Sequence, residues 1–285
     1  MAGMSPLYMF FHVRRTVIYL VIPRIINAMA NDIPKMTGDD VRLLTDRIRN
    51  AVEATGCKGV VLGLSGGIDS AVVAKLCVDA IGAENVMCVF MPSRVTPHDD
   101  YKTTSDLCTQ WGMEYRILDV QPAVDSLSAI LATSSDTPLD RGNIAARCRM
   151  IVLFNLAKKM GKVVMGASNE SEIMIGYFTK FGDGACDISP LSGIYKTQVK
   201  QIARIIGVPG EIIKKPPTAG LWIGQTDEEE LGMTYDELDP ILYHISLGRT
   251  DDQISSVTGI PKGKAVSVRE WVIRSEHKRN PPVRP

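Results

Sequence analysis

The sequence predicts an α/β fold, a doubly wound parallel sheet flanked by helices. Short apolar runs bounded by glycine or proline recur along the chain, as is typical of strands that are buried on both faces. Each run is followed by a segment whose apolar residues recur at helical spacing. This alternation favours parallel strands joined by right-handed crossovers. Ligands bind such sheets beyond the carboxyl ends of the strands, so chemistry is expected after residues 65, 92, 120 and 167.

The elements are expected in regular order from residue 38 onward. Val41, Leu44 and Ile48 recur at helical spacing and predict the first helix. Strands are predicted over 59–65, 86–91, 115–120 and 162–166. Further helices are predicted over 69–81, 99–112, 140–160 and 197–206. A polar loop follows over 214–230, and two or three helices end the chain. We expect residues 211–230 to be mobile, because they offer little apolar surface to bury.

The composition is that of an ordinary globular protein. Of 285 residues, 45% are hydrophobic and 22% charged, and 32 basic side chains balance 32 acidic ones. A net charge of zero argues against a nucleic-acid binder. None of the six cysteines forms a C-x-x-C pair, which argues against a zinc or iron–sulfur site and favours reduced thiols in the cytoplasm.

Residues 1–37 are predicted to be an N-terminal extension that is peripheral or poorly ordered, and 38–285 a single domain with a C-terminal helical segment. His12, Arg14, Arg15 and Arg24 interrupt the apolar stretch near the start. No uninterrupted run approaches the roughly 18 residues of a membrane span, so no membrane partner is expected. The stretch only loosely resembles a signal peptide, and a misplaced start codon explains it as well as a genuine extension does.

The strongest motif follows the first predicted strand. Adjacent glycines let the backbone turn sharply and present N–H groups, two serines add hydroxyls, and a helix N-terminus faces the same space. Asp69 would repel a phosphate unless Mg²⁺ bridged the two. The loop contains neither G-K-[ST] nor G-x-G-x-x-G. A plain turn with Asp69 as a helix cap is the alternative to a pyrophosphate site.

This motif resembles the PP-loop, S-G-G-x-D-S, of N-type ATP pyrophosphatases. The resemblance implies an adenine nucleotide alpha hydrolase-like, Rossmann-like fold and cleavage of ATP between its α and β phosphates. The implied ATP-binding residues of the loop are Gly63, Leu64, Ser65, Gly66, Gly67, Ile68, Asp69 and Ser70. The loop alone does not identify the substrate that is adenylated.

Later segments resemble the ammonia-dependent NAD synthetases within that superfamily. They are R-G-N-I-A-A-R-C-R-M at 141–150, G-A-S-N-E-S-E at 166–172, G-Y-F-T-K-F-G-D-G at 176–184, P-L-S-G-I-Y-K-T at 190–197 and S-E-H-K-R at 275–279. The loop at 217–228 and the segment at 230–239 agree as well. The resemblance covers about residues 38–282.

The resemblance assigns roles to individual residues. Asp69 and Glu172 would hold Mg²⁺, and Asp183 and Lys196 would be catalytic, with Lys196 also on ATP. Ala167 stands at an ATP-binding position where the family has threonine, so a hydroxyl contact is missing or comes from Ser168. The implied deamido-NAD-binding residues are Arg147, Arg149, Lys180, Asp183, His277 and Lys278.

The implied reaction is the last step of NAD biosynthesis. ATP would convert the nicotinate carboxylate of deamido-NAD into an acyl adenylate, and ammonia would displace AMP to give NAD. Only about 37 residues precede the pattern, too few for a glutaminase domain, so we expect free ammonia or a separate ammonia-supplying subunit. The family also implies a homodimer with deamido-NAD at the interface.

Three other functions share parts of the pattern. A GMP synthetase would share the loop but should lack the R-x-R-M and S-E-H-K-R segments. A tRNA-modifying enzyme would need a basic face and usually has catalytic or cluster cysteines, so the neutral charge and the absence of C-x-x-C argue against it. A non-catalytic nucleotide sensor would not need Asp69, Glu172 and Lys196 together.

Overall fold

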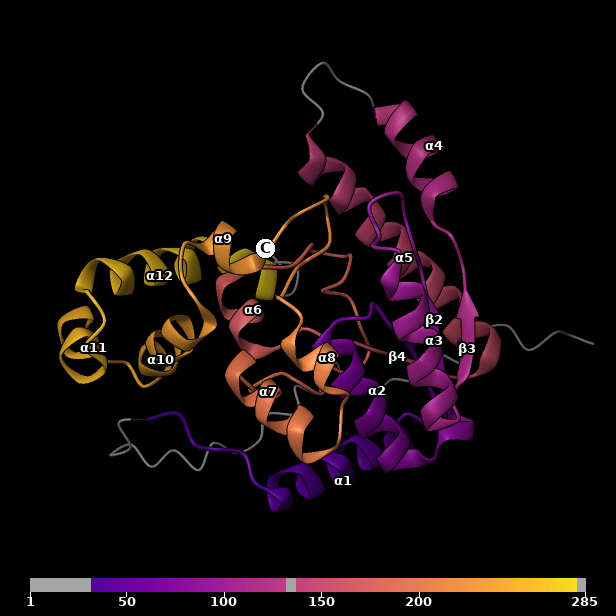
Figure 1. Ribbon diagram of the computed structural model, residues 1–285, viewed down its shortest axis with the longest axis horizontal. Coiled ribbons are helices and arrows are strands. Elements are labelled where there is room, and N and C mark those ends of the chain that lie inside the picture. Colours follow the sequence, from indigo (N-terminus) through magenta and orange to yellow (C-terminus); the bar gives the residue numbers. More distant parts are fainter. Residues whose placement is uncertain (1–31, 132–136, 281–285) are drawn as a thin grey trace, which may run out of the picture.

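Four parallel strands form the sheet of the computed structural model, which describes residues 32–131 and 137–280. In spatial order β3-β2-β1-β4, they are Glu114–Ile117, Val86–Phe90, Val60–Gly63 and Val163–Met165 (Figure 1). Val60 is paired with Val86 on one side and with Val163 on the other. The predicted parallel α/β fold is confirmed.

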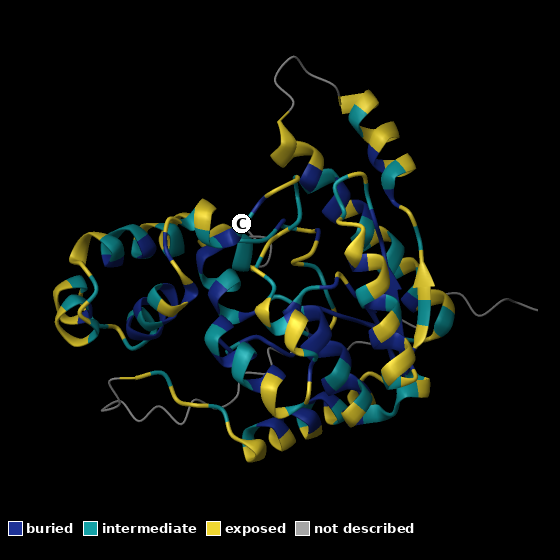
Figure 2. Ribbon diagram, viewed as in Figure 1, coloured by how far each residue is buried: buried dark blue, intermediate teal, exposed yellow. Residues whose placement is uncertain are grey.

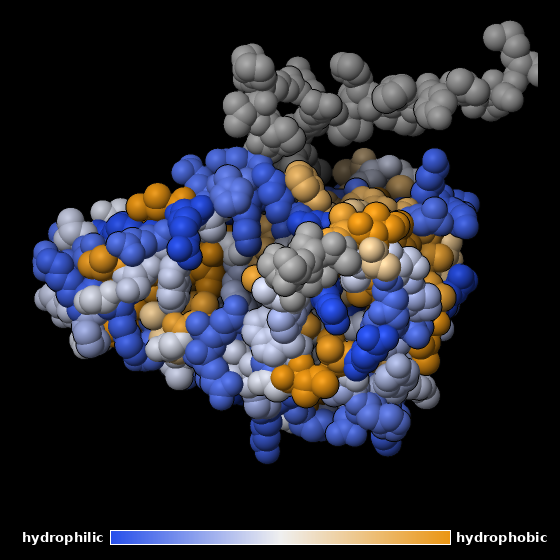
Figure 3. All heavy atoms as spheres, turned by 90° about the horizontal axis from the view of Figure 1, so that it is seen from above, coloured by the Kyte–Doolittle hydropathy of each residue, from blue (hydrophilic) through white to orange (hydrophobic). Residues whose placement is uncertain are grey.

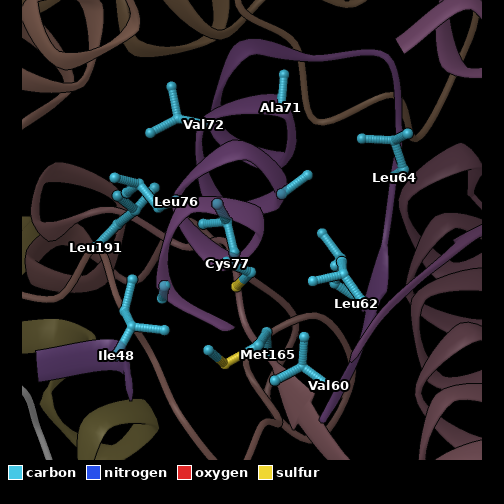
Figure 4. Packing of buried hydrophobic residues seen from close by; sticks show 14 of the residues in the cluster. Ile48, Val60, Leu62, Leu64, Ala71, Val72, Leu76, Cys77, Met165 and Leu191 are labelled. Atoms are coloured by element: carbon cyan, nitrogen blue, oxygen red, sulfur yellow. The ribbon is translucent and has the colours of Figure 1, made fainter. Parts of the chain in front are cut away.

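Helices cover both faces of the sheet. One face carries α1 (Gly38–Ala54), α2 (Ile68–Ile81) and α7 (Lys196–Ile205), and the other carries α4 (Gln121–Leu131) and α5 (Pro138–Met160). Alternate strand residues separate the two cores: Val60 and Leu62 face α2, as Figure 4 shows, whereas Val61 faces α5. This two-sided burial explains why the strands read as continuous apolar runs.

The edge strand β3 differs from the prediction. It ends at Ile117, three residues before the predicted end, and Glu114, Arg116 and Ile117 are exposed (Figure 2). The helix α3 (Asp99–Trp111) lies against β2 and β3. The sequence predicted no helix at α4, whose side chains are mostly exposed or half-buried apart from Val124.

A second apolar cluster lies beside the sheet. It is built from α10 (Tyr235–Ser246), α11 (Asp251–Thr258) and α12 (Lys262–Arg274), and it includes Ile175 at the end of α6 (Glu170–Ile175). The short helix α13 (Glu276–Arg279) follows α12. Short helices α8 (Gly210–Lys214) and α9 (Asp227–Leu231) stand at the two ends of the predicted polar loop, and a 3₁₀ turn spans Ala83–Asn85.

The last residues of the predicted N-terminal extension lie on α7. The Met36 amide donates to Gln201 Oε1 at 2.8 Å, and Gln198 Nε2 donates to the Pro34 carbonyl at 2.8 Å. Residues 1–31 of that extension lie outside the described residues. Across 32–131 and 137–280, no helix is both long and apolar enough to cross a membrane.

Candidate active site

The loop over residues 64–67, which we call the phosphate loop, joins β1 to α2. Its conformation is fixed by hydrogen bonds to the serines of the motif. The Ser65 amide donates to Ser70 Oγ at 3.1 Å, and the Gly67 amide donates to Ser65 Oγ at 3.2 Å. Gly66 adopts φ +81°, which a side chain would strain. These bonds fix a tight turn at the carboxyl end of the central strand, where the fold class predicts a ligand.

The N-terminus of α2 has no side-chain cap. Gly67 is the N-cap residue, and no side chain accepts a bond from the first turn there. Asp69 therefore does not cap the helix, which was the alternative interpretation of this motif. An open helix N-terminus beside a glycine turn favours an anion such as phosphate.

Asp69 instead faces a buried lysine. Lys196 Nζ donates to Asp69 Oδ2 at 2.5 Å and to Glu172 Oε1 at 3.2 Å. The lysine is 2% exposed, and its ammonium lies 5.2 Å from the ring centre of Tyr235. The structure thus brings together three predicted residues from α2, α6 and α7 in one buried cluster, which we call the lysine–carboxylate cluster (Asp69, Glu172, Lys196).

The charges in this cluster shift one another's pKa. Burial raises the pKa of Glu172 to about 8, with Lys196 acting in the opposite direction and Asp69 in the same one. Burial alone would lower the pKa of Lys196, but the charges of Asp69 and Glu172 outweigh it and raise that pKa above its usual value. Lys196 therefore stays positively charged beside the phosphate loop.

The two carboxylates suit a magnesium ion. Carboxylate oxygens are the ligands that Mg²⁺ prefers, and it usually takes only one or two of them, together with water and substrate phosphates. No group of three or more His, Cys, Asp or Glu side chains that could hold a metal occurs among the residues the structure describes. Asp69 and Glu172 fit a cation that completes its shell with phosphate oxygens.

Three residues that the sequence analysis did not single out position this cluster. Asn169 is fully buried, and its Nδ2 donates to Asp69 Oδ1 at 3.0 Å. Ser171 Oγ accepts from the Lys196 amide at 2.9 Å and donates to Asp239. Asn169 and Ser171 lie inside the 166–172 motif, and Asp239 on α10 ends the 230–239 segment. Both segments resemble the family, but neither indicated these contacts.

Ala167 lies after β4, where the family resemblance expects a threonine. It is half-buried and packs against the core on the α2 face of the sheet. A methyl group offers no hydrogen-bond donor at this position.

The helix α9 brings another carboxylate near the cluster. Asp227 is 2% exposed, and its Oδ2 accepts from the Tyr235 hydroxyl at 3.0 Å. Its Oδ1 is buried and has no hydrogen-bond partner in the described structure. Burial raises the pKa of Asp227, while the charge of Lys196 opposes that rise.

The remaining predicted residues form a second group, which we call the basic group (Arg147, Arg149, Lys180, Lys278). All four donate to main-chain carbonyls: Arg147 to Lys180 at 3.3 Å, Arg149 to Met91 at 3.0 Å, Lys180 to His277 at 2.6 Å, and Lys278 to Gly176 at 2.7 Å. Carbonyl acceptors satisfy the donors without cancelling the charge. Arg147 and Arg149 point to different partners, as their spacing on one helix predicts.

Asp183 lies in the turn beside the basic group. Its Oδ1 accepts from the Thr179 amide at 2.9 Å. The residue is exposed as a whole. The protein around its carboxyl group nevertheless excludes water and raises the pKa of Asp183, while the hydrogen bonds from Thr179 and the charge of Arg149 oppose that rise. No bond joins Asp183 to Lys196, so the two predicted catalytic residues belong to different parts of the site.

A pocket opens next to the basic group. It lies between the end of α6, α9, α12 and α13, and its lining includes Tyr177, Glu230, Trp271, His277 and Lys278. The His277 ring is exposed, and its Nδ1 lies 3.1 Å from the Arg274 carbonyl. An aromatic and basic lining of this kind suits an anionic ligand with flat rings.

Known proteins are similar to this chain in sequence and in fold. Residues 40–282 match the family model of NAD synthase. The NH(3)-dependent NAD(+) synthetase of Thermococcus kodakarensis is 43% identical over 246 residues, which cover 86% of this chain and 96% of that protein.

Solved structures agree. The NMN synthetase of Francisella tularensis superposes on this chain with a TM-score of 0.78 at 35% identity. The NH3-dependent NAD synthetase of Campylobacter jejuni, solved with a nitrate ion, superposes with a TM-score of 0.74 at 28% identity. Each comparison covers 88% of this chain and 99% of the other. With its fold, its phosphate loop and most of its length matched, this chain belongs to the NAD synthase family.

Proposed function

We propose that this enzyme uses ATP to amidate deamido-NAD with ammonia, giving NAD, AMP and pyrophosphate. The observation that carries the proposal is the lysine–carboxylate cluster beside an uncapped helix N-terminus and a glycine turn. The membership in the NAD synthase family and the name of the Thermococcus relative support the substrate and the use of ammonia.

In the first step, an oxygen of the nicotinate carboxylate attacks the α-phosphorus of ATP, and pyrophosphate leaves. Negative charge builds up on the α-phosphate and on the leaving group. We propose that loop amides within 65–70 other than those of Ser65 and Gly67, which donate to serine hydroxyls, stabilise that charge together with the ammonium of Lys196. Such stabilisation is the main source of catalysis in a site of this kind. We propose Gly63 to Ser70, Ala167 and Lys196 as the ATP contacts.

Mg²⁺ would be held by Asp69 and Glu172, and when bound it would neutralise phosphate charge. In the described structure the ammonium of Lys196 already lies between these two carboxylates. Lys196 thus balances their charge when the nucleotide is absent. A shift of this ammonium toward the phosphates would leave carboxylate oxygens for a cation.

In the second step, the nitrogen of ammonia attacks the acyl carbon of the adenylate, and AMP leaves. Ammonium must first lose a proton. Asp183 is proposed to hold the ammonium ion and to accept that proton, because burial of its carboxyl group raises its pKa and makes it a better proton acceptor than an ordinary aspartate. The basic group, with His277, is proposed to bind the phosphates and carboxylate of deamido-NAD.

A homodimer is part of the proposal. The helices α4 and α5 pack together and expose large apolar side chains: Leu127, Ile130, Leu131, Leu139 and Ile151. Ile130 is 77% exposed, and Figure 3 shows hydrophobic residues gathered on the upper side of the molecule where these helices lie. Such an apolar face favours a second copy of the chain. Analytical ultracentrifugation should give a dimer, and Ile130→Glu should weaken it.

The enzyme is proposed to act in the cytoplasm. All six cysteines are free, and four of them are buried. A reduced compartment suits thiols of this kind.

The decisive test mixes the purified chain with ATP, Mg²⁺ and deamido-NAD, and adds either ammonium or glutamine. NAD is measured with a coupled dehydrogenase, and AMP and pyrophosphate are measured separately. NAD from ammonium and not from glutamine is the expected result. AMP without NAD would show adenylation that lacks its nitrogen source, and no cleavage of ATP would favour the nucleotide sensor.

The same assay should include nicotinate mononucleotide as an alternative acceptor. One similar structure is named an NMN synthetase, so this comparison separates the two substrates. We expect faster amidation of deamido-NAD, and a faster reaction of the mononucleotide would contradict the proposed substrate.

A further inference from the structure

The segment 215–226, which we call the crossing segment, links α8 to α9 and spans the candidate active site. Figure 1 shows it as the orange loop that rises toward α5. At its start, Lys215 forms an ion pair with Asp100 in the first turn of α3. In its middle, Leu221 lies so close to α5 that a side chain on Gly142 would approach Leu221 Cβ to 2.7 Å.

Asp100 is pressed against the phosphate loop. It is 5% exposed, and a Cβ atom built on Gly66 would lie 2.8 Å from Asp100 Oδ1. A carboxylate therefore touches the loop that receives the phosphates of ATP. Its negative charge opposes the binding of a polyphosphate unless a cation balances it.

Lys215 is the balancing cation, and it is the movable member of the pair. Asp100 is fixed within α3, where its amide donates to the Pro97 carbonyl at 3.2 Å and its carbonyl accepts from the Thr104 hydroxyl at 2.7 Å. The Lys215 side chain is 31% exposed and lies at the start of the crossing segment. A small shift of its flexible stem moves the ammonium, whereas Asp100 cannot follow.

We propose that Lys215 is a nucleotide-binding residue, which pairs with Asp100 in the free protein and with a phosphate of ATP in the complex. Asp100 then acts as a positioning residue that holds the ammonium beside Gly66 before the nucleotide arrives. This inference rests on the proposed use of ATP.

The two members of the pair should have opposite effects on nucleotide affinity. Removing Lys215 deletes a contact to phosphate and leaves the Asp100 charge uncompensated beside the loop. Removing the charge of Asp100 releases Lys215 for the phosphate. If the pair were only a structural tether for the crossing segment, both changes would loosen the segment and act in the same direction.

The test measures the binding of Mg²⁺ and α,β-methylene-ATP by isothermal titration calorimetry, with no second substrate present. Lys215→Met should weaken binding by about 10-fold or more, the value of one charge-assisted hydrogen bond. Lys214→Met, at the exposed neighbouring lysine, is the matched control and should stay within about 2-fold. Asp100→Asn should bind as tightly as the wild type or more tightly, and it should restore part of the affinity of Lys215→Met.

Salt dependence gives a second readout. Lys215→Met should reduce the slope of log Kd against log salt, whereas Lys215→Arg should keep it. Thermal unfolding of each variant shows whether the variant is folded.

The inference is overturned if Lys215→Met binds the analogue like the wild type, or if Asp100→Asn weakens binding as much as Lys215→Met does. A wild-type chain that does not bind the analogue at all would instead overturn the proposed function, and with it this inference.

Discussion

The lysine–carboxylate cluster and the basic group use the same residue types in opposite ways. In the first, the buried Lys196 contacts two carboxylates, so positive charge is cancelled inside the protein. In the second, arginine and lysine side chains donate to main-chain carbonyls, which satisfy their donors and leave their charge in place.

This difference shows what each part lacks before substrates bind. The cluster has two carboxyl groups around one ammonium, and Glu172 holds its proton up to about pH 8, so the cluster gains an excess of negative charge and suits a further cation once that proton is released. The basic group has an excess of positive charge and suits the phosphates and carboxylate of a dinucleotide. The free protein therefore contains two preformed parts of the site, one suited to a cation and the other to anionic groups of the substrate.

The largest expected effect comes from Lys196→Met. It leaves the Asp69 carboxylate without its ammonium partner in a buried cluster, so the free energy of unfolding should fall by about 3–5 kcal/mol. Activity should fall about 100- to 1,000-fold because a charge that stabilises the transition state is lost. Urea unfolding and the NAD assay measure the two effects.

Lys180→Met is the matched control from the basic group, because that lysine donates to the His277 carbonyl rather than to a carboxylate. Its unfolding free energy should change by less than about 1 kcal/mol. Equal destabilisation by both variants would contradict the comparison.

Asp183→Asn should separate the two half-reactions. Amide formation should fall by about 100-fold or more, since the variant cannot take a proton from ammonium, while pyrophosphate release should change much less. Single-turnover measurement of pyrophosphate and NAD tests this. Equal losses in both steps would remove Asp183 from the proposed amidation step.

Glu172→Gln should flatten the pH dependence of stability. Burial raises the pKa of Glu172 to about 8, whereas a glutamate in the unfolded chain titrates near about 4.3. Between about pH 4.3 and 8, Glu172 is protonated in the folded state and ionised in the unfolded chain. Its contribution to the free energy of unfolding therefore decreases as the pH rises toward about 8. Urea unfolding at about pH 5.5 and 8.5 should show a smaller decrease for the variant than for the wild type. Glu229→Gln, at an exposed glutamate on α9, should keep the wild-type decrease.

Ala167→Thr should have the smallest effect. A restored hydroxyl should lower the KM for ATP by at most about 5-fold, the value of one neutral hydrogen bond. If Ser168 already supplies that contact, Ser168→Ala should raise the KM and Ala167→Thr should do little. Steady-state kinetics at varied ATP concentration distinguishes the two.

The sequence predicted the sheet well because buried parallel strands leave a clear pattern of continuous apolar residues. It predicted β3 less well, because an edge strand with exposed Glu114 and Arg116 lacks that pattern. The helix α4 was missed because it buries only Val124 against the core, and its other large apolar residues, such as Ile130, are exposed.

The sequence motifs indicated which residues belong to the candidate site, but not which of these residues contact one another. In the sequence, Lys196 stands just before the helix predicted over 197–206, where its positive charge opposes the helix dipole. The structure adds Asp239, whose Oδ2 accepts from the Thr197 amide at 2.7 Å and offsets that dipole. A carboxylate 42 residues away along the chain leaves no local signal of this role.

The pairing of β1 with β4 has a consequence for biosynthesis. Val60 and Val163 are partners in the sheet although about 100 residues separate them, so one edge of β1 stays unpaired while that length of chain is made. At the usual speed of translation this takes roughly 5 to 20 s. Lys196, the partner of Asp69, emerges later still. The nascent chain thus carries an open, strongly apolar strand edge for seconds, the kind of surface that chaperones bind and that leads to aggregation when synthesis outpaces folding.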